Sequence, residues 1–196
     1  MVYGMNINDL RDNARIKNIP IMQDGGIAFI KNFIKNNNIK TILEIGSAVG
    51  YSAISFALLD KNIKVYTLER DIKRYGEAVN NINDFNLNNQ IIIKNVDALE
   101  YELNDKFDLI FIDAAKSQYI KFFEKYKNNL KSNGVIITDN LSFHGMVENP
   151  SLTHNRNTKQ LVGKIRKYID FLKNNEEFDT EFFSDGDGIS VSKKKN

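Results

Sequence analysis

The stretch that decides the fold lies between residues 41 and 50 and reads Thr41-Ile42-Leu43-Glu44-Ile45-Gly46-Ser47-Ala48-Val49-Gly50. Its first half is a short apolar run, typical of a strand that is buried on both faces of a parallel sheet. Gly46 allows a sharp backbone turn after the strand, and Gly50 allows a helix to begin close to it. The free N–H groups at the start of such a helix can bind a polar or anionic group. The stretch therefore predicts a strand, a ligand-binding loop and a helix.

Strand-like and helix-like stretches alternate after this unit. Runs rich in β-branched residues predict the first strand and four more, at Thr41–Ile45, Ile63–Leu68, Gln90–Val96, Phe107–Ile112 and Gly134–Thr138. Apolar residues at helical spacing predict two buried helix faces, one with Ile72, Tyr75, Val79 and Ile82 and one with Ile120, Phe123, Tyr126 and Leu130. This alternation is typical of a doubly wound α/β fold.

The two ends of the chain depart from the alternation. Residues 1–36 predict two helices that form an N-terminal cover, and residues 158–173 predict another helix. Asp179–Ser184 and Gly188–Ser192 alternate like strands, and the turn sequence between them predicts a hairpin. We therefore expect a single domain over residues 1–196, whose mostly parallel seven-stranded sheet ends in an antiparallel hairpin.

Composition limits the chemistry that this chain can perform. The 196 residues include no cysteine and two histidines, which excludes disulfides and thiolate metal sites and disfavours a zinc site rich in histidine. Oxygen ligands from Asp and Asn remain, and these suit hard cations such as Mg²⁺. The net charge of +2 permits a nucleic-acid partner without requiring one. Because signal-peptide features and long apolar runs are lacking, we expect a cytoplasmic protein without a membrane partner.

Acidic residues close the second and third predicted strands. Glu69 follows the glycine loop by about 20 residues, where a carboxylate can accept hydrogen bonds from both ribose hydroxyls of an adenosine. The alternative is a helix N-cap cluster, a role that we expect for Asp71. Asp97 can accept from the adenine amino group or be a plain turn carboxylate, and Ser52 can add a hydroxyl. The glycine loop, Glu69 and Asp97 follow three successive strands, and together they favour a nucleoside site.

Further oxygen-bearing side chains close the next two predicted strands. Asp113 follows one of these strands, and Asp139 and Asn140 follow the other. If the strands are neighbours, two carboxylates and an amide oxygen converge, and Mg²⁺ would relieve the repulsion. The alternative is two carboxylates that cap separate helices. Lys116, at the rim, is either a general base or oxyanion-stabilising group, or a surface lysine in a helical first turn. Asp108 is expected at the opposite strand end, in a structural role.

These motifs resemble those of the metal-dependent O-methyltransferases related to catechol and caffeoyl-CoA methyltransferases. The resemblance lies in Glu44-Ile45-Gly46-x-x-x-Gly50-Tyr51-Ser52, Ile112-Asp113-Ala114-Ala115-Lys116-x-x-Tyr119 and Thr138-Asp139-Asn140. Within that superfamily the chain is similar to the bacterial tRNA 5-hydroxyuridine methyltransferases over residues 16–194. The narrower match is carried by Ile19-Pro20-Ile21-Met22-Gln23, Glu69-Arg70-Asp71-x-x-Arg74-Tyr75 and Gly186-Asp187-Gly188, among other segments.

The resemblance implies a Rossmann-like methyltransferase fold, a cofactor, a metal and a set of site residues. Contacts with S-adenosylmethionine are implied for Met22, Glu44, Gly46, Ser52, Glu69, Asp97, Ala98 and Asp113. Ligation of Mg²⁺ or another divalent cation is implied for Asp113, Asp139 and Asn140, and catalytic roles for Asp113 and Lys116. The reaction implied is the O-methylation of 5-hydroxyuridine at the tRNA wobble position to 5-methoxyuridine. The implied partners are the tRNA anticodon arm and a second copy of the chain in a homodimer.

Other functions fit parts of the same sequence. The basic residues of the last predicted helix either contact anticodon-arm phosphates or form a solvated face; they are Arg156, Lys159, Lys164, Arg166 and Lys167. A small-molecule catechol or phenylpropanoid methyltransferase would share the metal chemistry but would need an apolar lid. A non-catalytic RNA-binding module would leave the intact metal constellation unexplained. A nicotinamide dehydrogenase is disfavoured by the incomplete glycine pattern and by the terminal hairpin.

Overall fold

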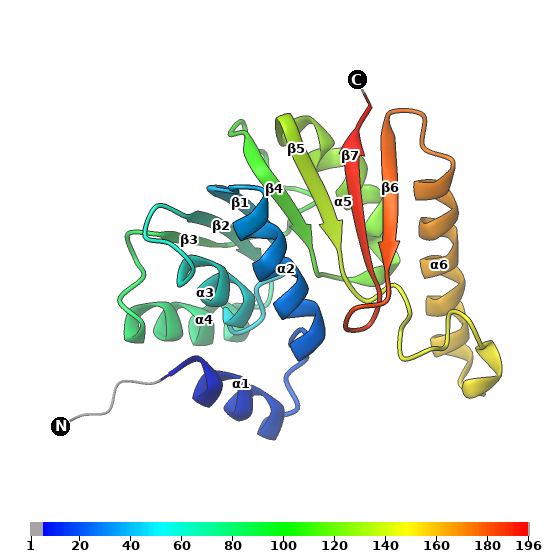
Figure 1. Cartoon of the computed structure of the whole chain (residues 1–196). Coiled ribbons are helices and arrows are strands. Elements are labelled where there is room, and N and C mark those ends of the chain that lie inside the picture. Colours follow the sequence, from blue (N-terminus) through cyan, green and yellow to red (C-terminus); the bar gives the residue numbers. More distant parts are fainter. Residues whose placement is uncertain (1–5, 196) are drawn as a thin grey trace.

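A seven-stranded sheet separates two layers of helices in the computed structural model, which describes residues 6–195 (Figure 1). The strand order is β3-β2-β1-β4-β5-β7-β6, and neighbours are parallel from β3 to β5, whereas β7 is antiparallel to both β5 and β6. The strands are β1 (Thr41–Ile45), β2 (Lys64–Glu69), β3 (Ile91–Asn95), β4 (Phe107–Ile112), β5 (Leu130–Thr138), β6 (Phe178–Phe183) and β7 (Ile189–Lys194). The seven-stranded α/β sheet with its terminal hairpin is as predicted.

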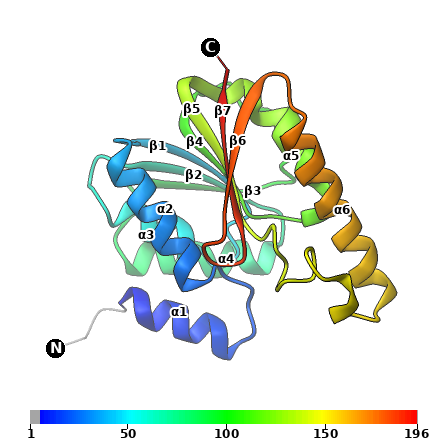
Figure 2. The ribbon, with the colours of Figure 1, turned by 45° about the vertical axis from the view of Figure 1, so that its right-hand side comes forward.

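Six α-helices cover the two faces of this sheet within residues 6–195. They are α1 (Ile7–Ile16), α2 (Asp24–Asn36), α3 (Tyr51–Ala57), α4 (Ile72–Asp84), α5 (Tyr119–Tyr126) and α6 (Arg156–Lys173). The first four lie on one face, and α5 and α6 lie on the other (Figure 2). Three 3-10 turns, η1 (Lys116–Gln118), η2 (Lys127–Asn129) and η3 (Pro150–Leu152), complete the elements. The predicted cover and domain also include residues 1–5 and 196, which lie outside the described residues.

Side chains of each central strand enter two apolar layers. In β1, for example, Ile42 packs beneath the helices of the first face and Leu43 beneath those of the second. Both side chains are fully buried, which explains why the strand is apolar at successive positions instead of alternating. Among the helices within residues 6–195, none combines the length and apolar character needed to cross a membrane.

Four details of the sequence prediction were wrong. The fifth strand begins at Leu130 instead of Gly134, because Leu130 pairs with Phe107 before a register shift and the pairing resumes at Leu109. Leu130, expected on a helix face, is therefore part of the sheet. Ile72 is 64% exposed because it is the first residue of α4, whose buried positions come later. Ile120 is 36% exposed, because α5 follows directly on the 3-10 turn η1 and buries Tyr119, Phe122, Phe123 and Tyr126 instead.

The register of the sheet brings strand ends together at one edge. Ile112 at the end of β4 pairs with Ile45 of β1 on one side and with Thr138 of β5 on the other. Glu69, the last residue of β2, pairs with Asn95 at the end of β3. The residues that follow these strands therefore emerge side by side, where ligands bind in open α/β sheets.

Candidate active site

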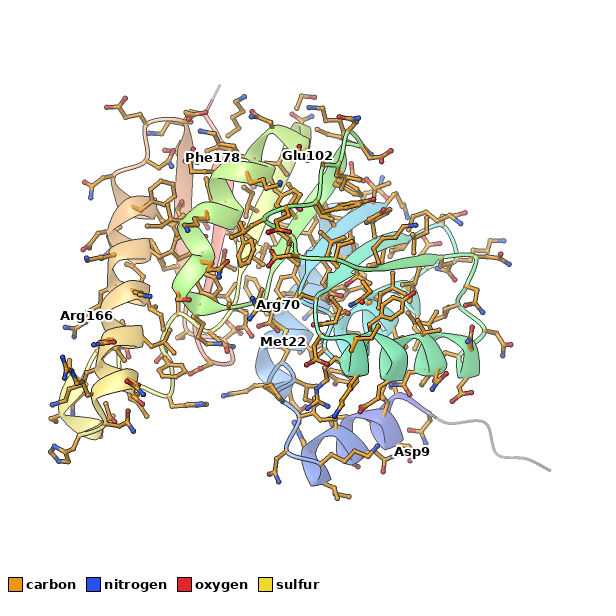
Figure 3. All side chains as sticks on the ribbon, turned by 180° about the vertical axis from the view of Figure 1, so that it is seen from behind. Asp9, Met22, Arg70, Glu102, Arg166 and Phe178 are labelled. Atoms are coloured by element: carbon orange, nitrogen blue, oxygen red, sulfur yellow. The ribbon has the colours of Figure 1, made fainter. Side chains whose placement is uncertain are left out.

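A cavity of about 340 Å³ lies at this edge of the sheet. Eight of the residues expected at the site line it: Gly46, Ser52, Glu69, Asp97, Ala98, Asp113, Lys116 and Asn140. The lining also includes residues that had no predicted role, namely Pro20, Ile21, Ser47, Ala48, Arg70, Ala114, Ala115 and Phe122. Arg70 and the nearby Met22 are labelled in Figure 3. One cavity thus joins the predicted nucleoside end to the predicted metal end.

The loop after β1 passes very close to the end of β4. Gly46 has φ +95°, and a Cβ atom at this position would lie 2.3 Å from the main-chain oxygen of Asp113. No other residue can occupy the position without moving one of the two backbones. The glycine therefore allows the cofactor loop and the first candidate metal ligand to share one wall.

Glu44 lies behind this wall, outside the cavity lining. Its side chain is fully buried and accepts hydrogen bonds of 2.5 Å from the hydroxyls of Ser52 and Thr67. Burial raises the pKa of Glu44 to about 7, and the two hydroxyl bonds only partly offset that rise. Glu44 thus orients Ser52, which does line the cavity. A direct contact between Glu44 and the cofactor stays a prediction.

Met22 is also buried outside the cavity lining. Its side chain packs against the backbone of Gly26 in the first turn of α2. The two residues before it, Pro20 and Ile21, line the cavity in its place. The segment that leads into α2 therefore contributes to the cavity wall, while a cofactor contact of Met22 itself stays a prediction.

The acidic residues at the nucleoside end are held by backbone N–H groups. The two carboxylate oxygens of Glu69 accept from Ala48 at 2.9 Å and from Asp71 at 2.8 Å. Asp97 accepts from the N–H of Leu99 at 2.8 Å through one oxygen. Since each carboxylate oxygen has two lone pairs, both side chains can still accept from hydroxyl or amino groups. Asp71 caps α4 through its side chain, as expected.

Asp113 lines the other end of the cavity, and Asp139 is buried next to it, outside the cavity lining. The N–H of Asp139 donates to the oxygen of Ile112, the residue before Asp113. Burial and the charge of Asp113 raise the pKa of Asp139 to about 8. Burial likewise raises the pKa of Asp113, against the opposing effect of Lys116. Two buried carboxylates that repel each other favour a proton or a cation between them.

A divalent cation fits this group of side chains. One carboxylate oxygen of Asp139, Oδ1, has no hydrogen-bond partner among residues 6–195, although it is buried. Its other oxygen accepts from the side-chain nitrogen of Asn140 at 2.7 Å, which leaves the amide oxygen of Asn140 free to bind a cation. Two carboxylates and one amide oxygen are hard ligands of the kind that Mg²⁺ prefers. The group contains two carboxylates and one amide, and within residues 6–195 no metal-binding group of three or more His, Cys, Asp or Glu side chains occurs.

Lys116 lies at the rim of the same cavity, as the first residue of η1. Its Nζ atom lies 5.8 Å from the centre of the Phe143 ring. The lysine charge counteracts the rise in the pKa of both Asp113 and Asp139. Lys116 therefore provides positive charge beside the paired carboxylates, next to an aromatic surface.

Sequence reasoning missed the contact that holds the loop after β5. Asp187, at the tip of the β6–β7 hairpin, is buried and accepts from the N–H of His144 at 2.6 Å. The main chain of the hairpin accepts from Leu141 at 3.0 Å and from Ser142 at 2.8 Å. Phe143 and His144 both have positive φ, which these bonds maintain. The hairpin turn was visible in the sequence, but the contact of Asp187 with His144, 43 residues before it, was not.

The hairpin tip also contacts the segment at the start of α2. Gly186 has φ +60°, and a Cβ atom on it would lie 2.8 Å from the nitrogen of Gly26. The tip thus packs between the segment that supplies Pro20 and Ile21 and the loop that follows Asn140. Asp108, at the opposite end of β4, accepts from Lys40 and Thr41, as its predicted structural role requires.

Comparison with known proteins shows similarity to O-methyltransferases. A family model described as O-methyltransferase matches residues 5–195. A Staphylococcus aureus protein, provisionally described as a caffeoyl-CoA O-methyltransferase, has a crystal structure with 39% identity and a TM-score of 0.93, over 97% of this chain and 93% of that one. An O-methyltransferase from Bacillus cereus, solved in complex with SAH, has 25% identity and a TM-score of 0.80, over 100% and 94%. A catechol O-methyltransferase from Niastella koreensis is 36% identical over 115 residues, 55% of this chain and 52% of that protein.

Proposed function

The chain belongs to the O-methyltransferase family, and on that premise we propose that it transfers the methyl group of S-adenosylmethionine to 5-hydroxyuridine at the wobble position of tRNA. The observation that carries this proposal is a cavity that joins acceptors for an adenosine to Asp113 and Asn140, with Asp139 buried beside them. A methyl donor and a hydroxyl acceptor can meet between these two ends.

The nucleoside end would hold the cofactor. Glu69 would accept from the ribose hydroxyls and Asp97 from the adenine amino group, since both carboxylates have lone pairs free. The loop at Gly46 and the start of α3 would hold the methionine part, with Ser52 held in place by Glu44. These acceptors support the choice of S-adenosylmethionine.

The other end would place the acceptor oxygen in line with the methyl group. Mg²⁺ held by Asp113, Asp139 and Asn140 would lower the pKa of the substrate hydroxyl and orient it beside a neighbouring carbonyl oxygen. The hydroxyl would first lose its proton to water, and the charge of Lys116 would stabilise the resulting oxyanion. The oxygen would then bond to the methyl carbon as the sulfur–methyl bond breaks, which would leave S-adenosylhomocysteine. Most of the catalysis is thus placement of the two reactants.

Two observations support a tRNA substrate. The motifs match those of the 5-hydroxyuridine methyltransferases, and the exposed face of α6 carries basic residues that suit a phosphate backbone. A wobble base lies in a single-stranded loop, so that it can enter a pocket at modest cost. We also propose the homodimer that the resemblance implies, which sedimentation velocity would test.

A small catechol-type substrate is the second candidate. The descriptions of the Niastella koreensis and Staphylococcus aureus relatives favour it. Phe143, beside Lys116, offers an aromatic surface of the kind that a phenolic ring would contact. The metal chemistry is the same for both candidates, because each presents a hydroxyl next to a second oxygen.

Labelled-methyl transfer distinguishes the two candidates. The purified protein is given labelled S-adenosylmethionine and Mg²⁺ with either tRNA that carries 5-hydroxyuridine or a simple catechol. We expect label in 5-methoxyuridine, with a kcat/KM for tRNA well above that for catechol. Label in catechol with none in the tRNA would reject the wobble substrate and retain the family chemistry.

A further inference from the structure

A second cavity lies between η3 and the amino-terminal half of α6. Its volume is about 320 Å³, and its lining includes Pro150, Ser151, Lys159, Val162, Gly163 and Arg166. It shares no lining residue with the catalytic cavity. Neither the metal nor the cofactor chemistry makes use of it. We call it the η3–α6 pocket.

The charge of this pocket is positive and uncompensated. Its lining contains Lys159 and Arg166 but no Asp or Glu. Neither cation forms an ion pair with any residue between 6 and 195, whereas Lys125 of α5 and Lys127 of η2 both have carboxylate partners. An anionic group would supply the missing partner.

Arg166 is held in place for such a role. Its Nε and Nη2 atoms donate to the main-chain oxygen of Val147, at 2.9 Å and 2.5 Å. The other guanidinium donors are left open, and Figure 3 shows this residue at the outer surface of α6. A fixed guanidinium loses little freedom when it binds a phosphate oxygen.

The shape of the pocket suits more than a bare anion. Gly163 lies within α6, and a Cβ atom on it would have no other atom within 4 Å. The absence of a side chain here therefore leaves open space in the pocket. Pro150 and Val162 supply apolar surface, and Ser151 supplies a hydroxyl. A sugar can lie on the apolar surface while its phosphate reaches the two cations.

The pocket is close enough to the catalytic cavity for one strand of RNA to reach both. Val147, which Arg166 binds, follows Asn140 by seven residues, so these Cα atoms are at most about 25 Å apart. In addition, α6 packs against η1, which begins with the catalytic-rim residue Lys116. A few nucleotides of a single strand span such a distance.

We propose that the η3–α6 pocket binds the phosphate and ribose of a nucleotide that neighbours the methylated base. The inference rests on the proposed function and identifies a binding site for the RNA substrate outside the catalytic cavity. A free catechol cannot reach this pocket while it reacts. The pocket therefore favours a nucleic-acid substrate over a small phenol.

The test fills the pocket without removing any charge. Gly163→Leu places a side chain in the open space, and Gly76→Leu on α4 is the matched control, because Gly76 is also helical and has equally open surroundings. Both changes replace a helical glycine, so both should raise Tm. We expect the KM for tRNA carrying 5-hydroxyuridine to rise about tenfold or more in Gly163→Leu alone, with kcat within about twofold of wild type.

A charge variant gives an independent readout. Lys159→Gln should weaken tRNA binding at low salt and reduce the slope of log affinity against log salt by about 1, while calorimetric affinity for S-adenosylmethionine stays unchanged. An unchanged KM for tRNA in both Gly163→Leu and Lys159→Gln would overturn the proposal. If the wild-type protein does not methylate the tRNA at all, the proposed function is rejected. The proposal for the pocket is then rejected as well, because it rests on that function.

Discussion

At the scale of single residues, the site depends on close backbone contact and on buried acids that support other side chains. Gly46 lets the loop after β1 lie against Asp113, a contact that any Cβ atom would prevent. Glu44 illustrates the second case, because it lines no cavity yet fixes Ser52 by a hydrogen bond. From the sequence, the sharp turn at Gly46 could be predicted, since it is local, but its contact with Asp113 could not. The position of Glu44 could not, because it depends on Thr67 in the neighbouring strand.

The buried carboxyl of Glu44 predicts a pH dependence of stability. Its pKa is about 7 in the folded protein against an ordinary value of 4.5. Because the folded state binds the proton more tightly, this group stabilises the fold most below pH 4.5 and loses that contribution as the pH rises to 7. The loss amounts to about 3 kcal/mol, at about 1.4 kcal/mol per pH unit.

Glu44→Gln removes this titration. Urea unfolding of wild type and variant across the same pH series should give a stability difference that shifts in favour of the variant as the pH rises. The comparison cancels the titration of the other acids, which both proteins share. A difference that stays constant with pH would show that Glu44 titrates normally.

At the scale of elements, strands were easier to predict than the faces of helices. The bounds of β1 and β4 match the prediction, because strands buried on both faces are apolar throughout and end at residues that favour turns. The buried faces of α4 and α5 were only partly predicted, because their phase depends on where the sheet and the preceding turn place the first residue. Ile72 and Ile120 are apolar, but neither faces the sheet.

The hairpin tip gives a prediction at this scale. Asp187→Ala removes the acceptor for the N–H of His144, so the loop from Ser142 to Gly145 should relax from its left-handed conformation. The loop follows Asn140 directly, and loss of one such bond costs about 1.5 kcal/mol. We therefore expect kcat for methyl transfer to fall about tenfold, with unchanged calorimetric affinity for S-adenosylmethionine.

Asp187→Asn is the conservative control for this change. Its amide oxygen can still accept from His144, so it should retain most of the wild-type kcat. Equal rates for wild type and the alanine variant would contradict a positioning role. A large loss of cofactor affinity in the alanine variant would instead indicate that the tip acts through the start of α2, against which Gly186 packs.

At the scale of the whole molecule, the Rossmann-like methyltransferase fold is confirmed, and its strand order decides whether the site exists. The sequence placed oxygen-bearing residues after successive strands, but it could not establish that β4 and β5 are neighbours. The structure pairs Ile112 with Thr138, so Asp113 and Asp139 leave the sheet side by side. Pro20 and Ile21, from the segment before α2, complete the cavity wall, and the hairpin tip packs against the start of α2 and against the loop after Asn140.

The cation site proposed at the ends of these strands is tested most directly by labelled-methyl transfer with and without a chelator. The assay uses whichever of the two candidate substrates the wild-type protein methylates, and it includes Asp139→Ala, with circular dichroism to verify folding. We predict that excess chelator or the substitution lowers the rate by about 100-fold or more, and that added Mg²⁺ restores only the wild type. Full activity of the folded protein in chelator, or of the folded Asp139→Ala variant, would contradict a cation held by Asp113, Asp139 and Asn140.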